Sequence, residues 1–380
     1  MNGDVLFCGA WDEGPGYPRT TSLRLGLQAA GLTVRECRRP GLGRGKQQLL
    51  RAPWRWPRTW AAQRRQRRNL LADLRTAMQE VQPNCIVVPY PGHALVEAVR
   101  DTVDVPVVLD LFLSAYDTVV EDRELVRPGS LLAWWLQRVD ARACAAADLV
   151  LLDTPANAAY VQTLTGLPAE RFGWLPVHDP EAPADALPWC DGPKDLLRVL
   201  FFGTGVPLHG LGTLLDAVRT VPSVQLTLVG GTAADRARAT VELGPRLRLE
   251  PDFVDRTRLQ ELLAQSQLVV GVFGGSGKAQ RVVPFKLVHA LAAGRPVLTA
   301  ATPAVLGWLD GCGAVFMAPA GDAGQLAARL QELAGAPAEV EAAGAVARAA
   351  YDRHFGTERL AARWRELLDR LPASRIGDVA

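Results

Sequence analysis

Short apolar runs alternate with amphipathic segments through the first half of the chain. Each run is rich in valine, leucine or isoleucine, and turn residues separate it from a segment whose apolar positions recur at helical spacing. Such an alternation predicts parallel strands joined by helices. The strands expected in this half are Asp4–Cys8, Leu32–Cys37, Cys85–Pro89, Val105–Leu109 and Leu149–Leu152.

A second alternation follows a break in the pattern near Pro176. The segment VHDPEAPADALPWCDGPKD is rich in proline and acidic residues and has no periodicity, which is typical of a linker. We predict an N-terminal domain over 1–178, a linker over 179–195, a C-terminal domain over 196–355 and a C-terminal helix over 356–380 that could pack back on the N-terminal domain. The strands expected in the C-terminal domain are Leu196–Phe202, Val224–Val229, Arg246–Glu250, Leu268–Phe273, Pro296–Thr299 and Ala314–Met317.

These two domains predict an α/β protein made of two Rossmann-like, doubly wound domains that face a central cleft. Doubly wound sheets bind ligands outside the carboxyl ends of their strands, so we expect the chemistry in that cleft. Neither domain opens with a G-x-G-x-x-G turn followed by an acidic ribose ligand. A nicotinamide-dependent enzyme is therefore disfavoured.

The overall composition is that of a soluble globular protein. The 380 residues are 48% hydrophobic and 22% charged, with a formal net charge of +2. No basic leader precedes a long apolar core at the N-terminus, and no apolar run is long enough to span a membrane, so we expect a cytoplasmic protein. The six cysteines and five histidines are dispersed, which favours reduced thiols and predicts no metal site.

One stretch, Arg35–Arg68, departs from this balanced charge. It holds twelve lysines or arginines against one acid, Glu36, and its second half contains Trp54, Trp56 and Trp60. Pro53 and Pro57 are expected to interrupt any helix there. Arginine with tryptophan suits an anionic membrane surface, so Arg51–Arg68 predicts peripheral binding to the inner face of a membrane. The alternative is a solvated loop whose tryptophans fold into the domain, while nucleic-acid binding is not expected because no nucleic-acid-binding motif accompanies the charge.

The segment Gln267–Ala300 combines a strand, a glycine-rich loop and a helix. The apolar run Leu268–Phe273 is followed by three glycines, which allow the backbone to approach a ligand closely. Lys278, Arg281 and Lys286 then lie in the loop and at the start of the helix, where backbone N–H groups also favour negative charge. These features predict a phosphate or diphosphate site, although the same elements occur in any doubly wound domain.

Two stretches of the second domain carry a resemblance to a known family. The opening LFFGTGVPLHGLGTLLDAV and the later KAQRVVPFKLVHALAAGRPV together resemble family 4 retaining glycosyltransferases of the GT-B fold. The resemblance covers most of the chain and is weaker in the first domain, where VPYPGH, VPVVLDLFLSAYDT and ADLVLLDT carry it.

The resemblance implies that the second domain binds a nucleotide-sugar donor and the first binds a glycan or lipid-linked acceptor. It implies no cofactor and no metal, because the three cations can counter the charge of the leaving diphosphate. Many members carry two glutamates eight positions apart where this chain has Arg281 and His289. The donor-binding residues implied are Gly203, Thr204, Gly205, His209, Phe253, Val254, Gly274, Gly275, Lys278, Arg281, Lys286 and His289. For His209 the alternative is an exposed residue at a helix start, for His289 a helix residue packed on the sheet, and for Phe253 and Val254 plain core packing.

The acceptor residues implied for the first domain are Gly14, Gly16 and Arg19, in the glycine-rich turn after the first strand. His93 follows a strand end and could activate or orient an acceptor hydroxyl. Asp110 and Asp117 lie near a neighbouring strand end and could stabilise positive charge on the transferred sugar. His93 could equally be a surface or capping residue, and Asp117 could merely cap the next segment.

The function implied is transfer of a sugar in the synthesis of a cell-surface polysaccharide or glycolipid. Two alternatives remain open. One is a GT-B-fold epimerase or phosphorylase that acts on a nucleotide sugar or phosphorylated sugar. The other is a non-catalytic, membrane-associated nucleotide-binding protein, which the loss of the two glutamates favours.

Overall fold

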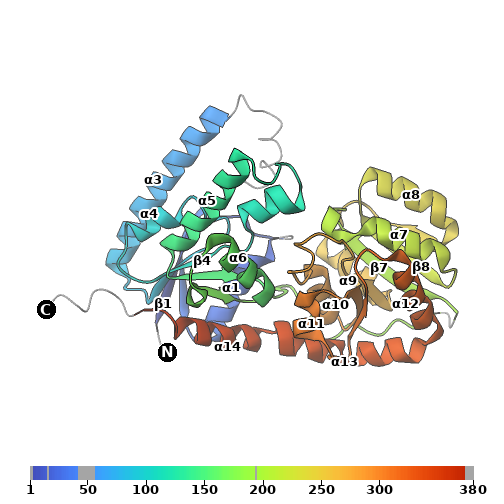
Figure 1. Cartoon of the computed structure of the whole chain (residues 1–380). Coiled ribbons are helices and arrows are strands. Elements are labelled where there is room, and N and C mark those ends of the chain that lie inside the picture. Colours follow the sequence, from blue (N-terminus) through green and yellow to red (C-terminus); the bar gives the residue numbers. More distant parts are fainter. Residues whose placement is uncertain (1–2, 15–16, 42–55, 193–194, 373–380) are drawn as a thin grey trace. The chain divides into compact units, whose positions relative to one another are not determined.

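The computed structural model describes residues 3–14, 17–41, 56–192 and 195–372, and for residues 56–63 only the backbone. The chain divides into two compact units (Figure 1). The first comprises residues 1–120, 125–178 and 357–380, and the second comprises residues 121–124 and 179–356.

The first unit is built on a parallel sheet with six strands among the described residues, in the order β2-β1-β3-β4-β5-β6. Its strands are β1 (Asp4–Trp11), β2 (Thr33–Pro40), β3 (Cys85–Val88), β4 (Val107–Asp110), β5 (Leu149–Leu152) and β6 (Phe172–Trp174). Its α-helices are α1 (Pro18–Ala29), α3 (Trp56–Glu80), α4 (Val96–Arg100), α5 (Leu131–Ala146), α6 (Pro155–Thr165) and α14 (Thr357–Leu368).

The second unit repeats this architecture with a parallel sheet in the order β12-β11-β10-β7-β8-β9. Its strands are β7 (Leu197–Gly203), β8 (Val224–Gly230), β9 (Leu247–Leu249), β10 (Leu268–Val270), β11 (Val297–Ala300) and β12 (Val315–Ala318). Its α-helices are α7 (Leu211–Thr220), α8 (Ala233–Leu243), α9 (Arg256–Ala264), α10 (Phe285–Ala292), α11 (Pro303–Leu309), α12 (Ala323–Gly335) and α13 (Pro337–Phe355).

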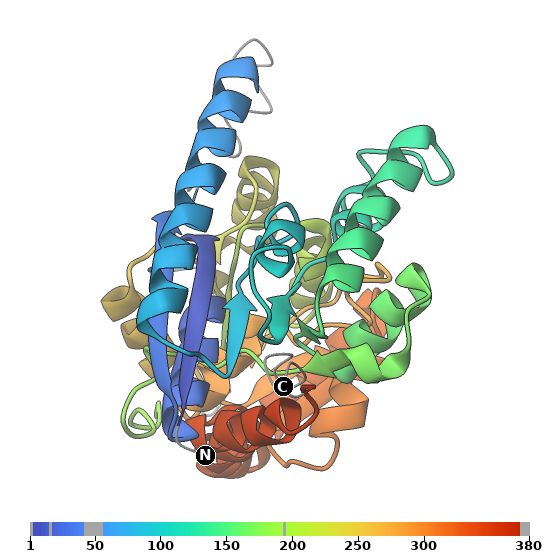
Figure 2. The same ribbon diagram turned by 90° about the vertical axis from the view of Figure 1, so that its left-hand side faces the viewer.

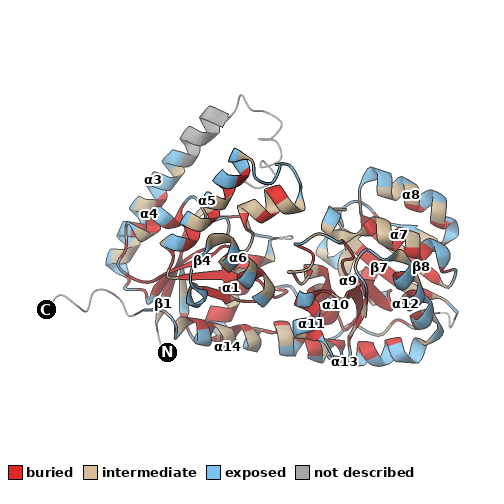
Figure 3. Cartoon of the chain, in the orientation of Figure 1, coloured by how far each residue is buried: buried red, intermediate tan, exposed pale blue. Residues whose placement is uncertain are grey.

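The inner strands of both sheets are buried along their whole length. Every residue of β3, β4 and β5, and of β10 and β11, is buried, which Figure 3 shows as continuous red arrows. Helices on both faces of a parallel sheet remove the strands from water, so they need unbroken apolar sequence. The predicted class, two Rossmann-like α/β domains, is confirmed.

Three elements differ from the sequence-based expectation. The strand β6 was not predicted; its three residues, Phe172–Trp174, have a glycine in the middle, which is unfavourable in a strand. The strand β10 ends at Val270 rather than Phe273. Gly271 and Val272 still exchange backbone hydrogen bonds with β11, but Phe273 and Gly274 donate their N–H groups to the carbonyls of His209 and Leu208 instead. One continuous helix, α3, begins at Trp56 and contains Pro57 in its first turn, where proline is tolerated, so the expected interruption at Pro57 was wrong.

The segment that follows Asp179 packs on the second unit. Leu187 and Trp189 contact the apolar clusters of that unit. The Arg295 side chain, 1% exposed, donates to the carbonyls of Leu187 and Leu263 and so fixes this segment to the end of α9.

Helix α14 packs against α1 in the first unit. The fully buried Trp364 donates from Nε1 to the Leu23 carbonyl at 3.0 Å. Gly26 makes room for the indole, because a Cβ at that position would lie 2.8 Å from Trp364 Cδ1. The last described helix is therefore part of the first unit's core.

In the part of the chain that the structure describes, no helix is long and apolar enough to cross a membrane. The six cysteines are free, and all except Cys312 are buried.

Candidate functional site

Lys286 lies in the first turn of α10, and its side-chain nitrogen lies beside β7. The residue is 6% exposed, and its Nζ lies 3.9 Å from the centre of the Phe201 ring on β7. Among the described residues, Nζ has no hydrogen-bond partner. Burial lowers the pKa of Lys286 from 10.5 to about 7, because the charged form loses its hydration.

His209 brings a second buried nitrogen to the same place. Its Nδ1 also lacks a hydrogen-bond partner within the described structure. A Cβ on Gly203 would lie 2.9 Å from His209 Nδ1 and 3.2 Å from Lys286 Nζ, so the end of β7 must be glycine for both nitrogens to fit. Burial, and then repulsion by Lys286, lowers the pKa of His209 to about 3.

We call Gly203, His209 and Lys286 the β7 pocket residues. Buried polar atoms nearly always have partners, so two unpartnered nitrogens at one strand end indicate a ligand that supplies acceptors. An anion placed there would restore the charge of Lys286, because a nearby negative charge raises the pKa of a lysine. The β7 pocket residues are therefore suited to bind a phosphate.

The glycine-rich loop after β10 is fixed to the turn before α7. Gly210 adopts a left-handed conformation with φ of 62°, and a Cβ there would lie 2.4 Å from the Phe273 carbonyl carbon. A Cβ on Gly274 would lie 2.5 Å from the Leu208 oxygen, to which the Gly274 N–H donates. The Gly274 N–H is thus already used within the protein, whereas nothing lies within 4 Å of the Cβ position of Gly275.

The two loop cations have acidic neighbours within the second unit. Lys278 Nζ lies 3.7 Å from Asp122, and Arg281 Nη2 lies 3.3 Å from Glu121. Lys278 is 7% exposed. These acids are far from the loop in sequence, so spacing did not reveal them.

His289, on α10, is held by two charged residues that the sequence did not single out. Its Nδ1 lies 2.7 Å from both Asp179 Oδ2 and Arg256 Nη1. Arg256 Nη2 also donates to Asp179 at 2.6 Å. Burial opposes ionisation of Asp179, but His289 and then Arg256 outweigh it and lower the pKa of Asp179 to about 2. The proline-rich acidic context of Asp179 suggested only a linker, so no sequence signal pointed to this cluster.

The remaining donor-side residues lie on turns at the same end of the sheet. Thr204 is exposed, and Gly205 adopts a left-handed φ of 73°, with the Thr232 N–H 2.9 Å from its Cβ position. Phe253 is 63% exposed just before α9, while Val254 is partly buried against the apolar cluster under α10. Phe253 is therefore not a core residue.

In the first unit, Arg19 and Asp110 form a buried pair. Arg19 Nη2 donates to Asp110 Oδ1 at 2.8 Å, and the two residues are 5% and 0% exposed. Arg19 Nε also donates to Asp110, while Nη1 donates to the Leu175 carbonyl and Nη2 to the Leu152 carbonyl. Arg19 and Asp110 thus tie α1 to the ends of β4 and β5, a role that spacing did not predict.

His93 lies beside a second buried acid, Asp140 of α5. The distance from His93 Nε2 to Asp140 Oδ1 is 3.2 Å. Asp140 is 0% exposed and accepts from the Ser114 hydroxyl and the Ala115 and Tyr116 N–H groups. Asp140 could have been noticed from the sequence, because it is an acidic residue at a position of the amphipathic helix that faces the core.

The other first-unit candidates are not brought into this cluster. Asp117 is 2% exposed at the start of a π-helical turn, Asp117–Asp122. Gly14 has a left-handed φ of 101° with open space around it. Gly16 lies outside the described residues. Within the described chain, no group of three or more histidine, cysteine, aspartate or glutamate residues could hold a metal ion.

Comparison with known proteins identifies the second unit. Residues 197–335, from β7 to the end of α12, match the family of glycosyl transferases group 1. The second unit is a group 1 glycosyltransferase domain. The resemblance predicted from sequence is confirmed at this level. A search of curated proteins finds no match to the chain.

Solved structures establish the fold of this glycosyltransferase. Sucrose-phosphate synthase from Thermosynechococcus elongatus aligns with a TM-score of 0.65 and 17% identity, over 97% of this chain and 99% of that one. HepE from Anabaena, solved in complex with UDP-glucose, aligns with a TM-score of 0.63 and 16% identity over 97% and 100%. A glycosyltransferase from Rickettsia africae aligns at 0.60 with 9% identity over 97% and 98%. The fold is GT-B.

Proposed function

We propose that the chain transfers a sugar from a nucleotide-sugar donor, with retention of anomeric configuration, to a glycan or lipid-linked acceptor in cell-surface polysaccharide or glycolipid synthesis. The observation that carries this proposal is the meeting of Lys286 Nζ and His209 Nδ1 beside Gly203, within the group 1 glycosyltransferase domain. A diphosphate supplies the acceptor oxygens that these nitrogens lack. HepE, which has the same fold, was solved with UDP-glucose.

The donor half of the reaction follows from charge. As the bond between the sugar and the diphosphate breaks, negative charge grows on the phosphate oxygens. Lys286 stabilises this charge from inside the domain, and Lys278 and Arg281 add to the positive potential of the loop. The exposed Phe253 contacts the nucleotide base, and Thr204 lines the donor at the end of β7.

In the proposed reaction, His93 is the residue that acts on the acceptor. Asp140 Oδ1 lies 3.2 Å from His93 Nε2 without a hydrogen bond between them, so the carboxylate acts on the ring through its charge. His93 then orients an acceptor hydroxyl and receives its proton as the new glycosidic bond forms. Asp110 and Arg19 keep the strand ends in place rather than contact the sugar.

A second candidate is a nucleotide-binding protein without transferase activity. Arg281 and His289 stand where many related enzymes carry glutamates, and His289 is engaged by Asp179 and Arg256. This candidate predicts diphosphate binding with no release of nucleotide from any sugar donor.

We also propose that Arg51–Arg68 brings the enzyme to the inner face of a membrane. Residues 51–55, including Trp54, lie outside the described residues, as do the side chains of Trp56 and Trp60. The described arginines Arg64, Arg65, Arg67 and Arg68 are exposed on α3. Their positive charge supports attraction to acidic lipid.

Thermal unfolding with UDP, GDP, ADP and dTDP tests the donor site. A diphosphate at about 100 times its dissociation constant should stabilise the protein by about 2.7 kcal/mol, a rise of a few degrees in Tm. Lys286→Ala should abolish most of that rise, whereas Arg353→Ala, an exposed change on α13, should not. A shift with one diphosphate followed by its release from the matching sugar donor supports transfer. No shift with any of the four refutes the proposed site.

A further inference from the structure

The N-terminal half of α5 exposes large apolar side chains on a helix whose other face is buried. Leu131 and Leu132 are 87% and 51% exposed, and Trp134 and Trp135 are each 55% exposed. Ser130 caps the helix, its hydroxyl accepting the Ala133 N–H at 3.2 Å. On the opposite face, Ala133 and Leu136 pack against Val120, and Ala143 and Cys144 further along the helix join the apolar cluster of the sheet. The exposed positions therefore contribute nothing to the core.

These side chains form a cluster rather than scattered exceptions. Among the described residues, five of the eleven exposed large apolar side chains lie between Leu125 and Trp135. Single exposed apolar residues are ordinary on a protein surface, but a contiguous group indicates a contact with a partner or a membrane.

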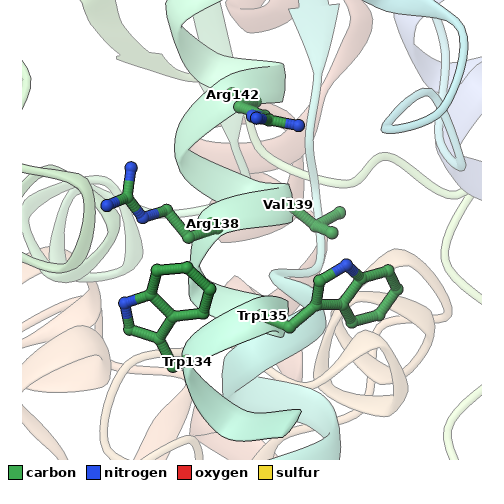
Figure 4. Close-up of a pocket in the computed structure, with 5 residues that line it drawn as sticks. All are labelled: Trp134, Trp135, Arg138, Val139 and Arg142. Atoms are coloured by element: carbon green, nitrogen blue, oxygen red, sulfur yellow. The ribbon is translucent and has the colours of Figure 1, made fainter. Parts of the chain in front are cut away.

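The charge next to this cluster is positive. The guanidinium of Arg138 lies 4.9 Å from the Trp134 ring centre. Arg138 and Arg142 line, with Trp134, Trp135 and Val139, a surface hollow of about 220 Å³ (Figure 4). The acid of α5, Asp140, is fully buried and bound to Ser114 and its neighbours. The exposed face of α5 therefore carries arginine and no acid.

The α5 cluster and the basic helix α3 belong to the same unit. In both views the N-terminal ends of α3 and α5 extend beyond the sheet in the same direction (Figures 1 and 2). Arg64 and Arg68 of α3 are also exposed.

We propose that Leu131, Leu132, Trp134, Trp135, Arg138 and Arg142, here called the α5 surface, contact the interface of an anionic phospholipid bilayer. Indole rings favour the boundary between headgroups and acyl chains, because they are apolar with one polar N–H. Arginines on the same face meet the lipid phosphates. Two copies of the α5 surface would bring like charges together in a two-fold dimer, which disfavours a second chain as the occupant. This surface is independent of the donor site.

Co-sedimentation with vesicles of phosphatidylcholine, with and without phosphatidylglycerol, tests the α5 surface. The full chain should bind only the acidic vesicles, and binding should fall as salt is added. Trp134→Ser/Trp135→Ser should weaken binding by about tenfold for each tryptophan. Arg138→Gln/Arg142→Gln should weaken it by about fivefold for each arginine.

Matched control variants distinguish a loss of vesicle binding at the α5 surface from non-specific adsorption by exposed side chains and from unfolding of the variant. Val241→Ser/Leu306→Ser removes two apolar side chains that are 84% and 44% exposed on other helices, and it should leave binding unchanged. Arg353→Gln/Arg365→Gln is the control for the removal of two positive charges, since both arginines are exposed on other helices, and it should also leave binding unchanged. All variants should keep the wild-type Tm.

Three results would overturn the proposal. The first is a wild-type chain that binds neither kind of vesicle. The second is a tryptophan variant that sediments with acidic vesicles as wild type does. The third is a wild-type dimer that the tryptophan variant converts to monomer without any vesicle binding, which would assign the surface to a second copy.

Discussion

Lys286 makes the stability of this protein depend on pH in an unusual direction. In the folded chain Lys286 is neutral above about pH 7, while in the unfolded chain its amine stays protonated up to 10.5. Between these values the unfolded state binds more protons, so the free energy of unfolding rises with pH. The slope for one such group is about 1.4 kcal/mol per pH unit.

Urea unfolding of the wild type and of Lys286→Met measures this effect. Methionine fills similar space without a charge, so subtracting the variant removes the titration of every other group. The free energy of unfolding of the wild type, relative to the variant, should rise by about 2.5 kcal/mol from about pH 7.5 to about pH 9.5. Lys286→Met should also be more stable than the wild type at the lower pH, because folding of the wild type at that pH must remove a proton from Lys286.

A flat difference between the two proteins would refute this reasoning. It would mean that water or an acceptor reaches Nζ in the folded state, so that the Lys286 pKa is near its ordinary value. Arg353→Met, an exposed substitution on α13, should show the same pH profile as the wild type.

Two further predictions concern the ligand and the first unit. When UDP binds at about pH 8, the protein should take up close to one proton, because Lys286 becomes charged again. Calorimetry should show this as a binding enthalpy that depends on the buffer. Lys286→Arg should bind UDP without proton uptake, and uptake by that variant would assign the proton to another group. Arg19→Met should lower the free energy of unfolding by about 3–5 kcal/mol, because it leaves Asp110 charged and buried; a loss below about 1 kcal/mol in urea unfolding would show that Asp110 is not held as an ion.

The sequence predicted the fold class because its signals are local. Buried strands such as Leu149–Leu152 need unbroken apolar runs, and turn residues follow them. Each such element can therefore be recognised from its own short stretch of sequence. The pattern fails where an element is short or where a distant residue decides its end. Backbone hydrogen bonds to β11 continue at Gly271 and Val272, and Phe273 then donates its N–H to the His209 carbonyl in a distant turn, which nothing near Val270 in sequence shows.

The partners of site residues were harder to predict, because a contact between residues far apart in the chain produces no periodic pattern in the sequence. His93 was chosen for its place after a strand, but Asp140 beside it comes from a helix dozens of residues later. Asp179 was assigned to a linker by its composition, although it is 1% exposed and bound to His289 and Arg256. From sequence alone, an acidic residue in a proline-rich stretch is predicted to be exposed to solvent, and only the folded structure shows that Asp179 is buried.

The three cations of the glycine-rich segment therefore divide into two kinds, which their spacing could not distinguish. Lys278 and Arg281 lie near Asp122 and Glu121, so their charge is partly compensated before any ligand arrives. Among the described residues, Lys286 lies beside an aromatic ring and a histidine and has no acidic partner, and burial lowers its pKa to about 7. A buried ammonium that is charged only when an anion is present avoids the standing cost of an unpaired ion. An anion then gains a charge-assisted hydrogen bond to a buried side chain. On this reasoning Lys286, rather than the more obvious loop pair, sets the affinity of the domain for a diphosphate.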